Sequence, residues 1–201
     1  LLLNTGDKRI SSENRLLSTI AYRLDGKTTY GLEGSIFVAG SAIQWLRDEL
    51  NFFESAGDTE EIISHRNVKS KVLVVPAFTG LGAPHWDPDS RGSIFGLTRD
   101  TSIADLTAAT LESIAFQTKD LIGAMENDGA NFSELRVDGG MVANNWFSQQ
   151  LANILNIDVL RPKVIETTAL GASYLASMKA GLCPNIESLN SSWVSEKTFC
   201  S

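Results

Sequence analysis

Two adjacent glycines that follow a short apolar run have the spacing of a ligand-binding loop. They are Gly139 and Gly140 in the stretch VDGGMVANN, and an amphipathic segment begins directly after them. Glycine adopts positive φ angles and lets a ligand approach the main chain, because it has no Cβ. Ligands of open α/β sheets bind beyond the carboxyl ends of strands, where the following helix offers backbone N–H groups. The pattern therefore predicts either a ligand-binding loop or a tight strand-to-helix turn without a ligand.

Two asparagines, Asn144 and Asn145, follow at the start of that helix. Their side chains could contact a ligand, or they could simply satisfy the backbone donors of the first turn. The stretch lacks the GxGxxG of dinucleotide folds and the GxxxxGK(S/T) of P-loop enzymes. The motif alone therefore does not identify its ligand.

A second glycine-led helix start is predicted earlier, in the stretch FVAGSAIQW. Gly40 ends a strand there, and Gln44 follows one helical turn later on the same face. A glutamine amide both donates and accepts hydrogen bonds, which suits the edge of an adenine ring. The alternative is a surface glutamine on an amphipathic helix.

A third candidate is the loop FTGLGAPHWDPDSRG, residues 78–92, whose glycines, prolines and aromatic residues are typical of a structured, functional loop. Asp87 and Asp89 could touch a metal, or they could initiate turns beside their proline and serine neighbours. His85 has no partner at metal-ligand spacing, so no metal site is predicted. The sequence also contains no recognisable nucleophile motif, and no catalytic residue is assigned.

The elements that would position these residues alternate between strands and helices. Strands are expected at 1–4, 16–24, 28–36, 71–78, 135–138 and 159–161, and helices at 40–51, 58–65, 102–127, 143–155 and 168–180. The first three strands, two of them joined by Asp25-Gly26, predict an antiparallel meander. Ser102 and Asp105 form a capping box for the long helix.

With residues at about 40–100 set aside as an insertion, three antiparallel strands are followed by strands that alternate with helices. Such crossovers make the later strands parallel. The order predicts an α/β fold, a ribonuclease-H-like (actin-like ATPase) domain. It has a mixed sheet of three antiparallel strands followed by parallel strands, with flanking helices. Residues 1–201 are expected to form a single domain.

The composition narrows the class of partner. Seventeen basic residues against 24 acidic ones give a net charge of -7, which argues against nucleic acid or an anionic membrane as the main partner. No apolar run approaches the roughly 20 residues of a membrane span. Cys183 and Cys200 lack metal-ligand spacing and are expected to be unpaired thiols. The chain begins without Met and ends without a helix, so we expect a piece of a longer protein.

Residues 92–112, GSIFGLTRDTSIADLTAATLE, resemble the second signature of the FGGY family of carbohydrate kinases. The stretches LEGSIFVAGSAIQWLRDE, VVPAFTGLGAPHWDPDSRG, RVDGGMVANN and TALGASYLA are similar to its glycerol-phosphorylating members more than to those acting on xylulose or gluconate. His85 stands where tyrosine is commoner in that family. The resemblance covers essentially the whole chain, as the C-terminal, nucleotide-binding domain of a two-domain enzyme.

The resemblance implies transfer of the γ-phosphate of ATP to glycerol, giving glycerol 3-phosphate, with Mg²⁺ and in the cytoplasm. It also implies four nucleotide contacts. Gly40 and Gln44 match residues on the adenine and ribose side, and Gly140 and Asn144 match residues on the opposing wall. Gly139 is then the turn-maker, and Asn145 is unassigned.

The resemblance places the general base, a phosphate-contacting threonine and the glycerol contacts before Leu1. No catalytic or metal-binding residue is therefore predicted in this chain, and the chain alone is expected to be inactive. The expected partners are glycerol, ATP or ADP, and an N-terminal domain; a homo-oligomer is left open. The alternatives are a kinase for another polyol or sugar, and a non-catalytic actin-like ATP-binding module.

Overall fold

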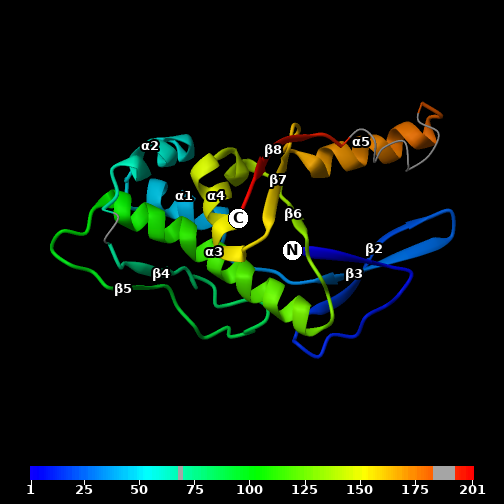
Figure 1. The fold of residues 1–201 in the computed structure, drawn as a ribbon, viewed down its shortest axis with the longest axis horizontal. Coiled ribbons are helices and arrows are strands. Elements are labelled where there is room, and N and C mark those ends of the chain that lie inside the picture. Colours follow the sequence, from blue (N-terminus) through cyan, green and yellow to red (C-terminus); the bar gives the residue numbers. More distant parts are fainter. Residues whose placement is uncertain (68–69, 183–192) are drawn as a thin grey trace. The chain divides into compact units, whose positions relative to one another are not determined.

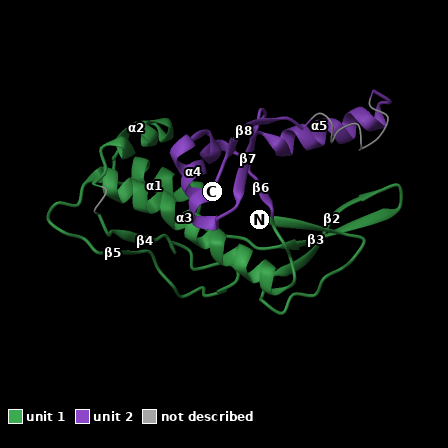
Figure 2. Ribbon diagram, in the orientation of Figure 1, with its two compact units in different colours: residues 1–132 green, residues 133–201 purple. Residues whose placement is uncertain are grey.

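The computed structural model describes residues 1–67, 70–182 and 193–201, and Figure 1 shows its helices and strands. The contacts divide the chain into two compact units, residues 1–132 and 133–201 (Figure 2). The first unit contains the three N-terminal strands, the segment predicted as an insertion and the longest helix. The second contains the Gly139-Gly140 turn and the elements around it.

The first three strands form an antiparallel sheet in the order β1-β3-β2, with β1 at Leu2–Gly6, β2 at Leu17–Leu24 and β3 at Lys27–Glu33. Asp25 and Gly26 both have positive φ, 49° and 78°, which is the geometry of a tight hairpin turn and confirms the predicted connection. The predicted meander order is wrong, because β1 pairs with β3. Gly31 on central β3 allows this, since a Cβ there would lie 2.7 Å from Cδ1 of Leu2.

The long helix α3, Ile103–Asn127, begins with the predicted capping box. Ser102 Oγ accepts from the amide of Asp105 at 3.2 Å, and the Asp105 carboxylate accepts from the amide of Ser102 at 2.9 Å. Many of the buried positions of α3 are occupied by small residues such as alanine, threonine and serine. In its C-terminal half, Leu121 and Met125, both 0% exposed, belong to a hydrophobic core cluster. This helix is therefore the central element of the first unit.

Between β3 and α3, the described residues form two helices, one 3-10 turn and two short strands. They are α1 at Gly40–Asp48, η1 at Ala56–Asp58, α2 at Thr59–Ser64, β4 at Leu73–Val75 and β5 at Ser93–Phe95. β4 and β5 pair in antiparallel fashion, and β5 was not predicted. α1, α2 and β4 all contact α3, so this segment packs on the central helix.

The second unit has a three-stranded sheet in the order β6-β7-β8, with β6 at Glu134–Arg136, β7 at Asp158–Pro162 and β8 at Ser195–Phe199. β6 and β7 are parallel, as the crossover rule predicts, and α4 at Asn145–Leu155 connects them. β8 was not predicted, and it pairs antiparallel with β7. Helix α5, Thr167–Lys179, is followed by Gly181 at φ +74°, a conformation that favours glycine after the end of a helix.

The predicted α/β class is confirmed, but the predicted single mixed sheet is wrong in its pairing. The strands of the described residues form three sheets, with three, two and three members. The helix expected from residue 143 begins at Asn145, because residues 140–143 form the 3-10 turn η2, Gly140–Ala143. No helix in the described part of the chain has the length and apolar character needed to cross a membrane.

Candidate functional site

Gly139 makes the turn that leads from β6 toward α4. Its φ of 84° lies in the region that favours glycine, which confirms its predicted role as the turn-maker. Its amide donates to the carbonyl oxygen of Ile165 at 2.8 Å, and the amide of Val137 donates to the carbonyl oxygen of Leu160 at 3.1 Å. The turn is thus held at both ends by main-chain bonds to the segment that contains and follows β7.

Gly140 is exposed and opens the 3-10 turn. A Cβ built on Gly140 would meet no atom of the described residues within 4 Å, so their packing does not require a glycine at this position. The open space above its main chain is what close approach of a ligand needs. This geometry is compatible with the predicted contact, which stays a prediction.

Asn144 is the N-cap of α4. Its Oδ1 accepts from the amide of Phe147 at 2.8 Å, so the capping alternative is confirmed for this residue. The asparagine side chain has both an acceptor, Oδ1, and a donor group, Nδ2, and the cap uses only Oδ1. Capping and a ligand contact are therefore compatible. Asn145 Oδ1 accepts from Lys197 Nζ at 3.1 Å, which ties the helix start to β8.

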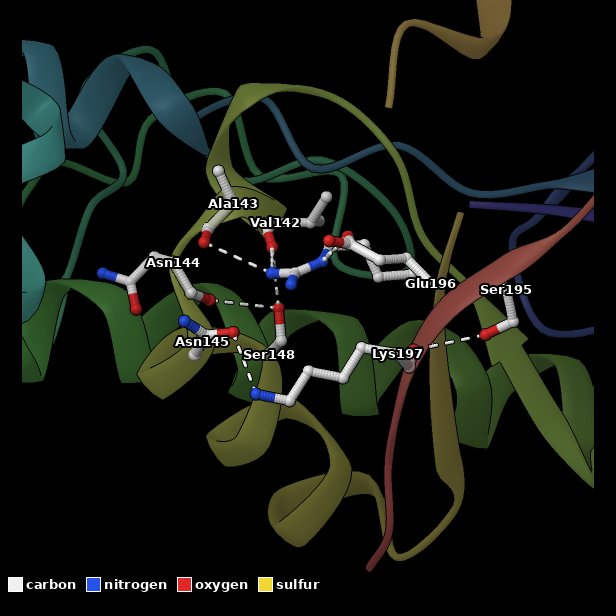
Figure 3. A network of polar contacts seen from close by, with 9 residues as sticks. Val142, Ala143, Asn144, Asn145, Ser148, Ser195, Glu196 and Lys197 are labelled. Carbon is white, nitrogen blue, oxygen red and sulfur yellow. Dashed lines mark hydrogen bonds and ion pairs between the residues drawn. The ribbon is translucent and has the colours of Figure 1, made fainter. Parts of the chain in front are cut away.

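A buried polar network below the loop was not predicted from the sequence (Figure 3). Arg161 on β7 donates from Nη1 to the carbonyl oxygens of Val142 at 2.9 Å and Ala143 at 3.2 Å. Ser148 Oγ lies 3.2 Å from the same Val142 oxygen and 3.1 Å from the carbonyl oxygen of Asn144. A usable signal was present, because Arg161 ends a predicted strand, and an arginine that is buried at such a position needs partners.

Gly40 and Gln44 lie on α1 in the first unit. Gly40 is the first residue of the helix, and no side chain of the described residues caps this end. Gln44 is exposed, whereas Ala42, Ile43 and Leu46 form the buried face. The glutamine amide therefore faces away from the core that α1 covers, as both the adenine-contact hypothesis and the surface alternative require.

The four predicted nucleotide contacts thus fall into two pairs. Gly40 and Gln44 are one helical turn apart on α1, and Gly140 and Asn144 begin and follow η2. The first pair belongs to residues 1–132 and the second to residues 133–201. Each pair is brought together within its own unit, and the shared pocket remains a prediction.

The signature residues of α3 have structural partners. Asp105 also accepts from the amide of Asn67 at 2.9 Å, and Glu112 pairs with Arg66 at 2.7 Å. Burial of Asp105 raises the pKa of its carboxyl, but hydrogen bonds from Ser102 and Asn67, with the nearby Arg66 charge, outweigh this and hold that pKa below its ordinary value. These residues anchor α3.

Asp87 and His85, in the loop at residues 78–92, also have partners within the protein. Asp87 Oδ1 accepts from the amides of Asp89 at 2.9 Å and Ser90 at 3.1 Å, so Asp87 initiates a turn, as one alternative predicted. His85 Nε2 lies 3.1 Å from Asp120 Oδ2 at an exposed position. Among the described residues, no group of three or more His, Cys, Asp or Glu side chains could hold a metal.

Comparison with known proteins identifies the family to which the chain is similar. A family model described as the FGGY family of carbohydrate kinases, C-terminal domain, matches residues 1–180. Glycerol kinase from Marinomonas sp. (strain MWYL1) is 56% identical over 199 residues, which cover 99% of this chain and 40% of that protein. Glycerol kinase from Rhizobium meliloti (strain 1021) is 54% identical over 201 residues, with 98% and 40% covered. The chain therefore spans about 40% of the length of these relatives.

Solved structures show the same fold. Plasmodium falciparum glycerol kinase, solved with ADP, matches with a TM-score of 0.87 and 35% identity, covering 100% of this chain and 40% of that one. A ligand-bound xylulose kinase from Lactobacillus acidophilus matches with a TM-score of 0.80 at 24% identity, covering 99% and 40%. The second likeness, at this low identity, concerns the fold alone.

Proposed function

Because the chain belongs to the FGGY family of carbohydrate kinases, we propose that it is the nucleotide-binding part of an enzyme that phosphorylates glycerol with ATP. The observation that carries this proposal is the 51–56% identity to curated glycerol kinases over 99% of the chain. A solved xylulose kinase and a solved gluconate kinase of the same fold are each 24% identical to the chain in sequence. The relative solved with ADP supports a nucleotide as the ligand.

The residues proposed to bind the nucleotide differ in what they supply. Gln44 is exposed on α1 and offers a donor and an acceptor to the adenine edge. Gly140 leaves its main chain open to close approach, and Asn144 places an amide at the start of α4. Gly40 begins α1, and the first turn of a helix presents backbone N–H groups. We propose that both pairs contribute contacts to the nucleotide.

The bond-making chemistry is proposed to reside outside this chain. Transfer of a phosphoryl group depends on positioning the acceptor hydroxyl and on stabilising charge at the phosphates. Mg²⁺ prefers carboxylates together with substrate phosphates as ligands, and the described residues offer no cluster of three candidate metal ligands. We propose that Mg²⁺ arrives with ATP and is held by phosphates and by an N-terminal domain, in the cytoplasm.

A substrate panel on the full-length protein tests this function. ATP consumption is measured with glycerol, xylulose, gluconate and no acceptor, and the phosphorylated product is identified. Glycerol is expected to give the highest kcat/KM by a wide margin. Transfer to another polyol or sugar but not to glycerol would replace the substrate. Nucleotide binding without transfer to any acceptor would favour the actin-like module.

A further inference from the structure

Arg161 connects the sheet of the second unit to the loop that contains Gly140 and Asn144. Its side chain is 10% exposed, and Nη1 donates to two successive main-chain carbonyls, those of Val142 and Ala143. Its Nε donates to Oε2 of Glu196 on β8 at 3.1 Å. One planar guanidinium group therefore bonds to the loop on one side and to the neighbouring strand on the other.

Burying such a cation is unfavourable unless its donors and its charge are both satisfied. Glu196 supplies the opposite charge from a side chain that is 53% exposed, and the ring centroid of Phe199 lies 5.4 Å from the guanidinium carbon. The carbonyl oxygens of Val142 and Ala143 accept the hydrogen bonds that Nη1 donates. A residue that only filled space would not need a charge here, so the interaction with the loop accounts for the arginine.

Ser148 supports the same loop from α4. It is 0% exposed, and its single hydroxyl proton is shared between the carbonyl oxygens of Val142 and Asn144. The carbonyls of three consecutive residues, 142 to 144, thus accept from Arg161 or Ser148. Since a fixed carbonyl fixes its peptide plane, these two side chains hold the end of the loop, from Val142 to the cap at Asn144. The main-chain bonds of η2, from the amides of Val142 and Asn144, connect that end to Gly139 and Met141.

We infer that Arg161 is a positioning residue for nucleotide binding: held by Glu196, it keeps residues 140–144 in the conformation that the nucleotide meets. The inference rests on the proposed function, because it takes this loop as one wall of the nucleotide site. Arg161 acts through main-chain carbonyls, so its removal displaces Gly140 and Asn144 without changing either side chain. Lysine is a poor substitute, because an ammonium group lacks the planar fork.

The first test measures ADP affinity by calorimetry, and KM for ATP and for glycerol, on the full-length protein. Arg161→Met keeps much of the side-chain volume and removes the donors. We expect it to weaken ADP binding and raise KM for ATP by about tenfold, the effect of losing roughly one charge-assisted hydrogen bond. KM for glycerol should change little. Arg161→Lys should fall between Met and wild type.

Arg136→Met is the matched control. Arg136 lies on the neighbouring strand β6, with its side chain 60% exposed, and it pairs with Glu134 at 3.0 Å. The Arg136→Met variant should bind ADP with the affinity of the wild type. Equal ADP affinity for wild type and a folded Arg161→Met would overturn the inference. Equal rises of both KM values would assign Arg161 a merely structural role and overturn it as well.

Hydrogen exchange without nucleotide gives an independent readout. In Arg161→Met, amides of residues 140–144 should exchange faster, while those of β7 and β8 stay protected. If that variant does not fold, Glu196→Gln serves instead, because it keeps Arg161 and removes its counter-charge; the same pattern is expected at smaller size. Uniform loss of protection in both variants contradicts the inference. A wild-type protein that does not bind ADP overturns the proposed function, and the inference with it.

Discussion

The amide of Gly139 donates to the carbonyl oxygen of Ile165 at 2.8 Å. This bond joins the turn after β6 to the segment between β7 and α5, at a residue with φ of 84°. The neighbouring Gly140 has no such conformational demand and open space where a side chain would be. Two adjacent glycines therefore have different reasons to be glycine, and mutation can separate them.

Gly139→Ala is expected to destabilise the protein by about 1–3 kcal/mol, because the backbone at φ 84° and ψ 173° lies in a region that residues with a Cβ hardly ever adopt. Gly140→Ala should leave the melting temperature of the full-length protein nearly unchanged and raise KM for ATP, because its methyl group would stand in the approach to the main chain. Thermal melting and steady-state kinetics on both variants check this. A stable Gly140→Ala with normal KM for ATP would remove Gly140 from the nucleotide site.

Asn144 can be tested for capping and ligand binding separately. Asn144→Ala removes both functions and should destabilise α4 by about 1 kcal/mol. Asn144→Ser keeps an oxygen that can accept from the Phe147 amide, but it lacks the amide donors. We expect the serine variant to melt like wild type and to have a KM for ATP that is raised more than its KM for glycerol. Normal ATP kinetics in Asn144→Ser would leave this residue as a cap alone.

Gln44 is exposed on α1, so its replacement should not disturb packing. Gln44→Ala is expected to change stability by less than about 0.5 kcal/mol and to raise KM for ATP, because the adenine edge loses a donor and an acceptor. Glu49→Ala, at the exposed end of the same helix, is the control and should behave like wild type. Identical kinetics for the two variants would favour the surface alternative for Gln44.

Asp105 provides a prediction about pH. Its pKa in the folded protein lies below the ordinary aspartate value, because hydrogen bonds from Ser102 and Asn67 outweigh the effect of burial. Such a group contributes stability above its unfolded pKa of about 3.9 and loses it as pH falls through the folded pKa. Asp105→Asn should therefore melt below wild type at pH 7, and the difference should narrow below about pH 4.

Melting temperatures at pH 7 and pH 3.5 check this difference. The exposed Asp7 offers the matched control, and Asp7→Asn is expected to melt like wild type at both values. A gap between Asp105→Asn and wild type that stays constant with pH would mean that the carboxylate charge does not stabilise the start of α3.

Residues 1–201 produced alone are expected to bind ATP weakly and to show no measurable glycerol phosphorylation. Alignment of the reactants and exclusion of water normally require a closing cleft, and the chain spans about 40% of its relatives. A coupled assay for ADP release with glycerol measures this. Robust turnover by these residues would show that the acceptor site and the general base lie within them.

The features that were predicted correctly have local causes. Asp25-Gly26 adopts the positive φ angles of a tight turn, Ser102 and Asp105 bond across one helical turn, and Gly139 turns the chain after a strand. Each signal lies within a few residues of its effect. The parallel pairing of β6 and β7 also followed, because a connecting helix allows little else.

The features that were missed depend on distant partners. β1 pairs with β3, where Gly31 leaves room for Leu2, and β8 pairs with the edge of β7 that β6 leaves open. Arg161 contacts residues 18 and 19 positions earlier in the chain. Local sequence gives the side chain that needs a partner but not the partner itself. For the candidate site, the sequence points to individual positions whose nucleotide contacts stay predictions, whereas the partners of Arg161 and Ser148 beneath the loop could not be identified from it.

The small residues of α3 limit how this chain can diverge. Ala108, Ala115 and Thr107 are between 0% and 2% exposed, so these short side chains are covered almost completely by their surroundings. An added methyl group on those sides has no space to enter and must be matched by a loss of volume opposite. Sequence drift in this helix is thus restricted to compensated pairs of substitutions and to its exposed positions, such as Phe116 and Lys119.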